Sequence, residues 1–451
     1  MLTARVVDPA VESFESLRGR EFSRLDEQGH AYLDYTGSAL YAESQLRAHH
    51  ALLSGGIFGN PHSDSGPSRA STGIIDLARR RVLRFLGTDE QTHDVVFTAN
   101  ASAAIKLVAE SYPFRPGRSL LLTADNHNSV NGIREYARRA GARVGILPLD
   151  ADLRLSRPEA YLEAAPSGGG LFAFPAQSNF SGVRHSLLLV ERARDLGFEV
   201  LLDAAAYVPS RALSLRHCPA DFVALSFYKL FGYPTGLGAL VARRESLSLL
   251  RRPWFAGGTV EYASVAADTY RLREGHEGFE DGTPSFLAIA ALDAGFDLVE
   301  RVGMCRISAH VASLTRLLLS GLGDLRHTDG APLVWIHGPR SGDDRGGTVA
   351  FNVLDPRGRV LPYAEVEARA RTRGVSLRGG CFCNPGASES AFGLGRERIE
   401  ACLLKLEGGF TVERFGACLG TAVGAVRASV GLANVPEDVH RALDVVRSFR
   451  F

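Results

Sequence analysis

The sequence predicts an α/β protein whose main sheet is mostly parallel. Apolar runs of strand length alternate with helical patterns from residue 94 to residue 240, which is typical of a parallel sheet with helices on both faces. Two of these runs, 199–205 and 222–227, are largely apolar, as buried parallel strands are. Polar residues follow the carboxyl ends of both runs, where open α/β sheets bind their ligands.

Length and composition narrow the class of protein. The chain has 451 residues, enough for two lobes, and its 51 Lys and Arg balance its 50 Asp and Glu. No basic tract indicates nucleic-acid binding. Because we find neither an apolar span of membrane length nor the apolar run of a signal peptide, we expect a soluble, cytoplasmic protein that binds no membrane.

The 6 cysteines are too few and too scattered for a disulfide scaffold, and most of those outside Cys381 and Cys383 are expected to be core thiols. No second pair of Cys or His stands at zinc-ligand spacing, so no metal site is predicted.

The amino-terminal part is expected to contain a short strand, a helix and a loop before residue 73. The segment 31–41 predicts a short strand and a turn, and a helical pattern runs through 45–53. The Gly, Ser and Pro content of 54–72 predicts a loop. Apolar residues then recur at helical spacing over 73–87.

Strand-loop-helix units follow at 94–112, 119–141 and 169–197, with a further strand expected at 143–149. In the first unit, the turn that contains Ala101 and Ser102 would present free amide hydrogens at a helix start, which suits a phosphate. Many helix starts share this property, so the turn alone is a weak signal.

Two polar residues follow strands of the later units. His127 lies in the loop after one strand, where a lone histidine is more often a solvated surface residue than a catalyst. Asn179 follows the next strand, and its default interpretation is an Asx-turn residue.

The ends of the two largely apolar runs carry a carboxylate and a lysine. Asp203 ends the first run, and Ser226, Tyr228 and Lys229 end the second. This pair suits pyridoxal 5'-phosphate, because a lysine forms the Schiff base and an aspartate pairs with the pyridinium nitrogen. Lys229 is also one of only three lysines in the chain, and arginine cannot form that imine. From spacing alone, a strand-capping lysine and a turn aspartate are an equally good interpretation.

A second chemical centre lies at 375–387. Arg378 suits a bidentate grip on a carboxylate, and Cys383 follows it by five residues on an expected mobile loop, after a Gly379-Gly380 pair expected to be flexible. Cys383 can be interpreted as a reactive thiol. The alternatives are that Cys381 and Cys383 are incidental thiols or that they form a redox pair. The Gly, Asn and Pro context favours a reactive cysteine.

The chain after residue 290 predicts a smaller α+β lobe. Strands are expected at 334–338, 347–354 and 424–432, and helices at 364–374 and 436–449.

Four strings of the sequence carry a family resemblance. They are LDAAAYVP (202–209), ADFVALSFYKLFGYPTGLGAL (220–240), FEDGTPSF (279–286) and GGCFCNPGA (379–387). Through them the chain resembles the class V aminotransferase family, and within it the cysteine desulfurase-like domain of molybdenum cofactor sulfurases.

The resemblance implies a fold and a division of the chain. The fold is the pyridoxal-phosphate-dependent transferase fold type I, with a mostly parallel seven-stranded sheet in a large domain and a smaller α+β domain. Residues 1–60 would belong with the small domain and the mouth of the site, 61–290 would form the large domain, and 291–451 the small domain.

The resemblance also implies roles in binding the cofactor. Lys229 would hold it covalently, Asp203 would pair with its ring nitrogen, and His127 would stack on the ring and exchange protons. The other expected contacts are Ala101, Ser102, Ser226 and Tyr228 at the phosphate, Asn179 at the phenolic oxygen, and Thr283 at the phosphate of a partner subunit in a homodimer.

For the substrate, the resemblance implies that Arg378 and Asn179 bind L-cysteine and that Cys383 takes its sulfur as a persulfide, with Cys381 as the rival. L-alanine would leave, and the sulfur would pass to an unidentified protein or small-molecule acceptor. The alternatives are another class V enzyme, namely an aminotransferase, epimerase or C–S lyase, or a scaffold without catalysis. This chain has Ala206 and Tyr228 where bacterial iron–sulfur desulfurases usually have a glutamine and a histidine. Molybdenum cofactor sulfurases look similar to this chain at both positions, so the resemblance is to that subfamily.

Overall fold

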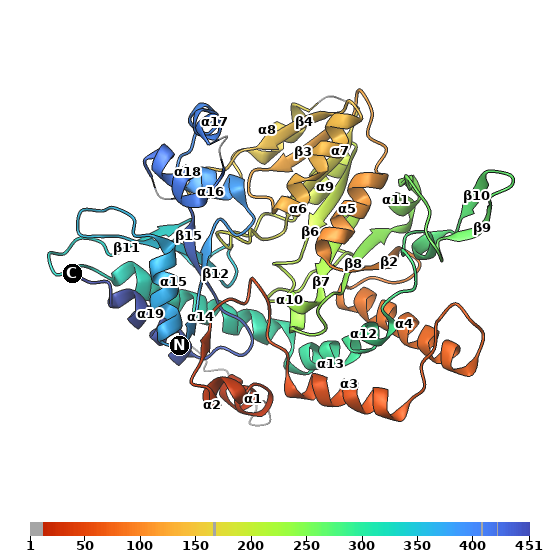
Figure 1. The fold of residues 1–451 in the computed structure, drawn as a ribbon, viewed down its shortest axis with the longest axis horizontal. Helices are drawn as coiled ribbons and strands as arrows, with labels where there is room; N and C mark the ends of the chain where they lie inside the picture. Colours follow the sequence, from red (N-terminus) through yellow and green to blue (C-terminus); the bar gives the residue numbers. More distant parts are fainter. Residues whose placement is uncertain (1–11, 166–167, 407–408, 422) are drawn as a thin grey trace, which may run out of the picture.

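The large lobe is built on a seven-stranded sheet. The structure is a computed structural model and describes residues 12–165, 168–406, 409–421 and 423–451. The strand order is β2-β8-β7-β6-β5-β3-β4, and only β8 runs antiparallel to its neighbours. This confirms the predicted fold class (Figure 1). The strands are β2 (His93–Thr98), β3 (Ser119–Thr123), β4 (Arg143–Leu147), β5 (Gly170–Pro175), β6 (Phe198–Asp203), β7 (Phe222–Ser226) and β8 (Gly238–Arg243).

Helices cover both faces of this sheet, so successive strand residues are buried on opposite sides. Leu120 and Leu122 of β3 pack into the core on one face, and Leu121 packs into the core on the other. One face carries α5 (Ala101–Ser111), α6 (Asn128–Asn131), α7 (Ile133–Arg139) and α11 (Arg244–Leu249). The other carries α4 (Gly66–Phe85), α8 (Pro158–Glu163), α9 (Leu188–Asp195) and α13 (Leu292–Val302). This double coverage explains the continuous apolar runs in the sequence.

The small lobe contains a four-stranded antiparallel sheet in the order β11-β12-β15-β14. Its strands are β11 (Val334–His337), β12 (Thr348–Val353), β14 (Arg378–Gly380) and β15 (Ala425–Ser429). The helices α14 (Met304–Asp324), α15 (Tyr363–Thr372) and α19 (Pro436–Arg447) pack with it. Between β14 and β15 the chain forms α16 (Pro385–Ala391), α17 (Arg396–Lys405) and α18 (Val412–Leu419).

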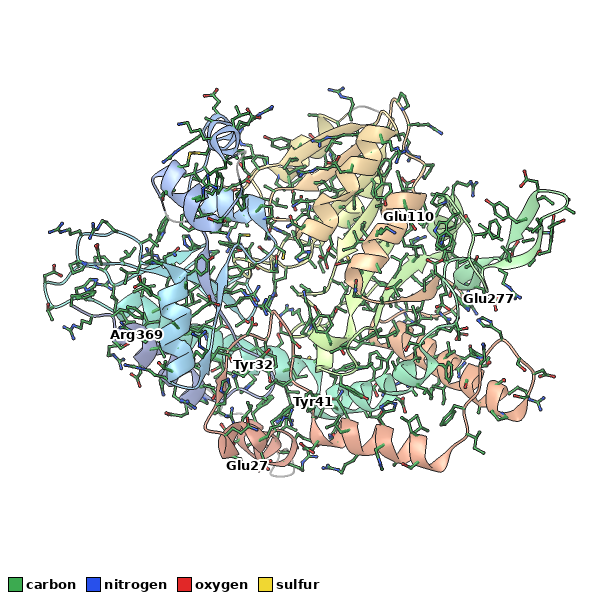
Figure 2. The ribbon with its side chains drawn as sticks, in the orientation of Figure 1. Glu27, Tyr32, Tyr41, Glu110, Glu277 and Arg369 are labelled. Carbon is green, nitrogen blue, oxygen red and sulfur yellow. A yellow bond between two sulfur atoms is a disulfide. The ribbon has the colours of Figure 1, made fainter. Side chains whose placement is uncertain are left out.

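The amino-terminal segment connects the two lobes. It contains α1 (Phe14–Glu21), α2 (Arg24–Glu27), β1 (Ala31–Tyr32) and α3 (Glu43–Gly55). Strand β1 pairs in parallel with β13 (Val375–Ser376), and Tyr32 lies near the small lobe (Figure 2), whereas α3 packs against α13 of the large lobe. The division of the chain at residues 60 and 290 stays a prediction.

One local expectation was wrong. The predicted loop 54–72 is shorter, because α3 continues to Gly55 and α4 begins at Gly66. The side chain of Ser65 caps α4 by accepting a hydrogen bond from the amide of Ser68, and a proline stands in the first turn. Ser-Gly-Pro is therefore a helix start here.

The glycine-rich and then charged segment 253–286 follows β8 and α11 of the large lobe. The segment contains the hairpin β9 (Val260–Ser264) and β10 (Thr269–Leu272), which projects from the large lobe (Figure 1). It continues into the short helices η1 (Gly275–Gly278) and α12 (Phe286–Ala290).

The cysteines outside the 375–387 segment are not all core thiols. Cys402 and Cys418 form a disulfide that joins α17 to α18, Cys305 is exposed, and Cys218 is buried. Among the described helices, none combines the length and apolar character needed to cross a membrane. The described residues also include no cluster of His, Cys, Asp and Glu that could hold a metal ion.

Candidate active site

A cavity of about 350 Å³ lies at the carboxyl edge of the large sheet. Strands β2, β3, β5, β6 and β7 all end at this edge, because each points in the same direction. The residues that follow these strands therefore converge, although they are far apart in the sequence. Eight predicted site residues line the cavity: Ala101, Ser102, His127, Asn179, Asp203, Ser226, Tyr228 and Lys229.

Lys229 lies in the short helix α10 (Phe227–Phe231), directly after β7. Burial lowers the pKa of its amine, and the nearby carboxylate of Asp203 partly opposes this shift. Asp203 accepts one hydrogen bond on Oδ1, from the amide of Ala205 at 3.0 Å. No other hydrogen bond reaches the Asp203 side chain from the described residues, so Oδ2 is available for a ring nitrogen in the cavity.

His127 presents one defined ring nitrogen to the cavity. Its Nδ1 accepts a hydrogen bond from the amide of Ser129 at 3.1 Å. In the neutral ring, the proton therefore belongs on Nε2. Burial lowers the pKa of the imidazole, with Asp203 opposing and Lys229 adding to the shift, so the neutral form is favoured near pH 7.

The amino-terminal end of α5 forms an anion cradle. Asn100 caps the helix by accepting a hydrogen bond from the amide of Ala103 at 2.9 Å. The amides of Ala101 and Ser102 are the first two of the helix and have no acceptor within it. In the same cavity, the hydroxyl of Ser226 is buried and has no partner among the described residues.

These groups match the parts of pyridoxal 5'-phosphate. The α5 amides and the unpaired Ser226 hydroxyl suit the phosphate, the free oxygen of Asp203 suits the pyridinium nitrogen, and the Lys229 amine suits a covalent link to the aldehyde. The predicted cofactor therefore fits the cavity.

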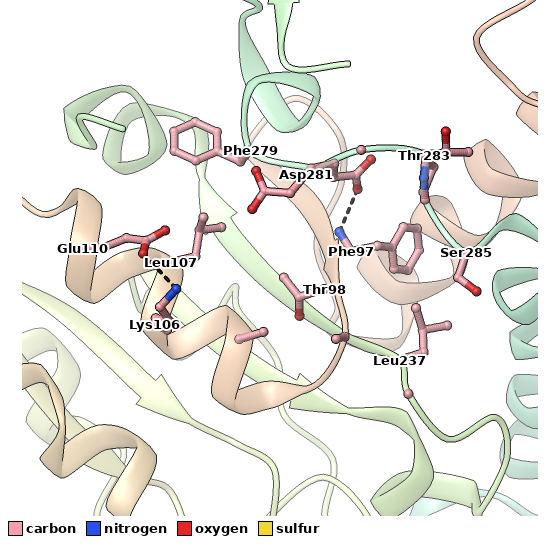
Figure 3. Close-up of a pocket in the computed structure, with 16 residues that line it drawn as sticks. Phe97, Thr98, Lys106, Leu107, Glu110, Leu237, Phe279, Asp281, Thr283 and Ser285 are labelled. Carbon is pink, nitrogen blue, oxygen red and sulfur yellow. Dashed lines mark hydrogen bonds and ion pairs between the residues drawn. The ribbon is translucent and has the colours of Figure 1, made fainter. Parts of the chain in front are cut away.

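Thr283 lies outside this cavity. It is exposed in a neighbouring cavity, also of about 350 Å³, which shares Ala99 and Gly236 with the first. Figure 3 shows Asp281 and Thr283 along one wall of the neighbouring cavity and Lys106 on helix α5. The structure thus does not bring Thr283 to the cofactor cavity of its own subunit.

Cys383 lies in a tight turn and does not line the cofactor cavity. The turn closes with a hydrogen bond of 2.9 Å from the amide of Asn384 to the carbonyl of Cys381. Both central residues, Phe382 and Cys383, have a φ of 56°, the positive values of a type I′ turn, which glycine, asparagine and aspartate usually occupy. Left-handed backbone at each of these residues costs about 1 kcal/mol or more.

Contacts from the large lobe hold this strained turn. Asn179 donates to the carbonyl of Phe382 at 2.7 Å, and the amide of Asn128 donates to the carbonyl of Cys383 at 2.7 Å. The Phe382 ring is buried, with its centroid 5.3 Å from that of Phe180. The thiol of Cys383 remains exposed, next in space to the loop that carries His127.

Asn384 completes this attachment and was not predicted as a site residue. Its fully buried amide donates to the carbonyl of Asp125 at 2.6 Å and to Oδ1 of Asn179 at 2.9 Å. Its Oδ1 accepts from the amide of Ala387 and so caps α16. The Asn-Pro pair after the cysteine was the available signal, since it is typical of a helix start.

The glycine pair before Cys383 does not lie in a flexible loop, whereas the mobility of the loop that carries Cys383 stays a prediction. Gly379 and Gly380 form strand β14, and the amide of Gly379 donates to Glu367 at 2.7 Å. A Cβ at Gly379 would lie 2.2 Å from the ring of Tyr363. Glycine is required here by close packing, not by freedom of motion.

Arg378 shares a carboxylate with an arginine that sequence analysis missed. Arg378 and Arg427 lie opposite each other on β14 and β15, an arrangement that would repel without a counter-charge. Asp34 lies between them, with Oδ2 2.7 Å from the Arg378 guanidinium and Oδ1 2.9 Å from that of Arg427. The Asp34 hydrogen bond raises the pKa of Arg378.

Arg427 is buried where the Cys383 turn meets the cofactor cavity. It donates to the carbonyl of Asn179 at 3.0 Å and lies over the Phe382 ring at 4.7 Å. The charges of Arg427 and Arg378 both lower the pKa of Lys229, and Cys383 raises it. All three groups are therefore within electrostatic reach of Lys229.

Comparison with known proteins agrees with this geometry. The sequence model of the aminotransferase class-V family matches residues 31–442. The chain is 36% identical to a molybdenum cofactor sulfurase of Arabidopsis thaliana over an aligned length of 481 residues, which covers 97% of this chain and 58% of the relative. A Homo sapiens molybdenum cofactor sulfurase is also 36% identical, over 96% of this chain and 51% of its own length. The chain thus spans little more than half the length of these relatives.

Solved structures show the same fold. A cysteine desulfurase of Thermococcus onnurineus superimposes with a TM-score of 0.79 at 27% identity, over 96% of this chain and 97% of that one. A cysteine desulfurase of Escherichia coli superimposes with a TM-score of 0.77 at 21% identity, over 97% and 98% of the two chains. The second likeness is evidence for the fold alone. From the family match over most of its length, the chain belongs to the aminotransferase class-V family.

Proposed function

We propose that the chain is a pyridoxal-phosphate-dependent cysteine desulfurase related to molybdenum cofactor sulfurases. It would convert L-cysteine to L-alanine and hold the sulfur as a persulfide on Cys383. The observation that carries this proposal is the attachment of the Cys383 turn to the edge of the cofactor site, through the hydrogen bond of 2.7 Å between the Asn128 amide and the Cys383 carbonyl. The similarity to sulfurases and to the Thermococcus onnurineus desulfurase supports the same chemistry.

The residues of the large lobe would bind and activate the substrate. Bound pyridoxal 5'-phosphate supplies an electron sink for the charge that develops on the substrate α-carbon. Asp203 would keep the ring nitrogen protonated, and Lys229 Nζ would carry the α-proton, because its lowered pKa favours the neutral amine that can accept it. His127 Nε2 is the second group that can exchange a proton there.

The residues of the small lobe would orient the substrate and take its sulfur. Arg378 would grip the carboxylate of L-cysteine through its guanidinium. The sulfur of Cys383, as thiolate, would attack the substrate sulfur and form the S–S bond while the substrate Cβ–S bond breaks. The electron pair of that bond returns to the substrate carbon skeleton, which leaves as alanine after taking up protons. An acceptor then receives the persulfide sulfur.

A single-turnover reaction with L-cysteine tests this proposal. Wild type is expected to release alanine and to gain the mass of one sulfur atom per chain, read by intact-protein mass spectrometry. Cys383→Ala should lose both signals, because the attacking sulfur is absent. The matched control Cys381→Ala removes the other exposed thiol of the same turn and should retain both.

Two outcomes would contradict the desulfurase proposal. Wild type that binds the cofactor but forms no persulfide would point to another class V reaction. Loss of the persulfide in Cys381→Ala, with Cys383→Ala unaffected, would assign the sulfur to the other cysteine.

We also infer that the protein acts as a homodimer. Thr283 lies exposed in the cavity beside the cofactor cavity, where a second subunit could reach it. If Thr283 contacts the partner's phosphate, Thr283→Ala should weaken cofactor binding severalfold without changing the light-scattering mass of a dimer. A monomeric holoenzyme with full activity would contradict the inference. A cytoplasmic location stays a prediction.

A further inference from the structure

A further cavity, of about 720 Å³, lies behind the segment that connects β5 to α9. Gln177 and Asn179 of this segment line the cofactor cavity, whereas residues 183–187 line this further cavity. Its volume falls in the range of small-molecule sites. The chemistry of its wall comes from basic and hydroxyl side chains: Arg154, Arg184, His185, Tyr207, Arg211 and Arg345.

Three of the arginines have no carboxylate partner. The buried Arg345 donates to the carbonyls of Ser181 and Thr348, each at 2.7 Å, and to that of Pro339, while its Nε is buried without a partner among the described residues. The Arg184 side chain makes one hydrogen bond among the described residues, from Nε to Oε1 of Gln177 at 3.3 Å. Arg211 makes no hydrogen bond or ion pair within the described ranges.

The acidic residues of the cavity do not neutralise these arginines. Glu159, Asp343 and Asp344 are all exposed. The only ion pair that they make with the arginines of the wall, within the described residues, joins Arg154 to Asp344 at 3.8 Å. Arg345 is buried, Arg184 is half-buried and Arg211 is exposed at the mouth of the cavity. An anion that enters the cavity would therefore gain from several guanidinium groups at once, at different depths.

The ionisation of the arginines agrees with this picture. Burial lowers the pKa of Arg184 and the neighbouring positive charge of Arg211 lowers it further, while Tyr207 and Asp344 oppose the shift without reversing it. Burial lowers the pKa of Arg345 to about 10, with Arg154 adding to the shift. An anion placed among these groups would reverse both effects.

The wall of this cavity is also connected to the candidate active site. Arg184 bonds the side chain of Gln177, which lines the cofactor cavity. His185 lies 2.7 Å from Oδ2 of Asp125, and the carbonyl of Asp125 accepts from Asn384, the residue after the reactive cysteine. Two adjacent residues of the wall thus contact both halves of the site.

We propose that this cavity binds a small organic anion with two or more phosphate or carboxylate charges, through Arg184, Arg211 and the Tyr207 hydroxyl. This inference does not depend on the desulfurase chemistry. The ligand is a second molecule, distinct from the cofactor and from an amino-acid substrate, and its site lies next to the segment that shapes the cofactor cavity.

Calorimetric titration of the holoenzyme with sodium pyrophosphate, and separately with citrate, tests the proposal. The bound cofactor occupies the α5 cradle and so removes the competing phosphate site. Saturable binding of at least one probe is expected, and Arg211→Gln should weaken it at least about fivefold, because a charge-assisted hydrogen bond is lost. The matched control Arg216→Gln removes an exposed arginine outside this cavity and should change the affinity by less than about twofold.

Hydrogen–deuterium exchange locates the binding. The bound probe should protect amides of 183–187 and 342–345, whose side chains line the cavity. Protection confined to 99–102 would place the anion in the cofactor cradle and overturn the proposal. So would the absence of saturable binding by both probes, or an affinity that Arg211→Gln leaves unchanged. Binding of pyrophosphate alone would assign a phosphate ligand, and binding of citrate alone a carboxylate ligand.

Discussion

Lys229 and Cys383 belong to one proposed site, yet the protein holds them in opposite ways. Lys229 follows a buried central strand, and burial lowers the pKa of its amine. Cys383 is exposed in a turn with positive φ, outside the sheet that presents the lysine. Buried surroundings suit a group that must change its protonation, whereas an exposed thiol can reach both a substrate and an acceptor.

The two regions also differ in what stabilises them. The lysine position depends on the core of the large lobe, where every residue of β7 is buried. The cysteine position depends on a few hydrogen bonds between lobes, from Asn128, Asn179 and Asn384. Substitutions near Lys229 and substitutions near Cys383 should therefore have different effects on activity and stability. Four predictions test this difference, from the largest expected effect to the smallest.

Lys229→Ala should have the largest effect. Turnover of L-cysteine should fall by about 10³-fold or more, because the group that holds the cofactor and moves the α-proton is lost. Lys106→Ala is the control, since Lys106 is an exposed lysine that pairs with Glu110, and its rate should match that of wild type. Steady-state alanine formation measures both. A Lys229→Ala rate above roughly a tenth of the wild-type rate would contradict the role of Lys229 in holding the cofactor and moving the α-proton.

Asp34→Asn should reduce kcat/KM for L-cysteine by about 10- to 100-fold, because Arg378 loses the carboxylate that orients it. The cofactor content should not change, since Asp34 does not line the cofactor cavity. Asp293→Asn, which alters an exposed carboxylate on α13, serves as the control. Steady-state kinetics and visible absorbance provide the measurements, and a normal kcat/KM would show that Asp34 has no role in substrate binding.

Asn384→Ala should lower the free energy of unfolding by about 1–3 kcal/mol, because it removes buried hydrogen bonds on both sides of the Cys383 turn. Persulfide formation should slow while cofactor loading stays normal. The control is Asn131→Ala, which removes one hydrogen bond to the Asn126 carbonyl and should leave sulfur transfer unchanged. Denaturant unfolding and rapid-quench mass spectrometry measure the two effects. Equal slowing in both variants would mean that the turn is not specifically held by Asn384.

The pH dependence of kcat/KM should show the smallest effect. Burial lowers the pKa of His127, so the imidazole stays neutral to a lower pH than a solvated histidine, whose pKa is about 6.5. Activity that needs neutral His127 is therefore kept above the lowered pKa and lost as the pH falls through it. His127→Gln should remove this acidic limb. A limb at or above pH about 6.5, or one that His127→Gln leaves in place, would contradict the assignment.

Most of the predicted cofactor residues line one cavity, and this could be predicted from the sequence for a physical reason. Asp203 and Ser226 end two apolar strands, and Lys229 lies in the short helix directly after the second one. Parallel strands end at the same edge of a sheet, so residues after different strands meet without any knowledge of side-chain packing. The position of the cavity at the carboxyl edge of the sheet thus follows from the apolar runs in the sequence and from the direction of the strands.

The contacts around Cys383 could not be predicted in the same way. Arg378 and Arg427 meet only because β14 and β15 pair across an excursion of three helices, and Asp34 reaches them from the opposite end of the chain. The Gly379-Gly380 pair suggested flexibility, whereas packing against Tyr363 requires the small residue. Antiparallel pairing and side-chain packing at long sequence separation leave no periodic signal.

The sequence by itself determined the α/β class, the strands of the large sheet and the residues at their carboxyl ends, because burial and chain direction are encoded locally in apolar runs. Only the tertiary structure decided how the Cys383 turn is held, which arginines share Asp34, and that a basic cavity lies behind Gln177. Those features depend on distances between segments that the order of residues does not specify.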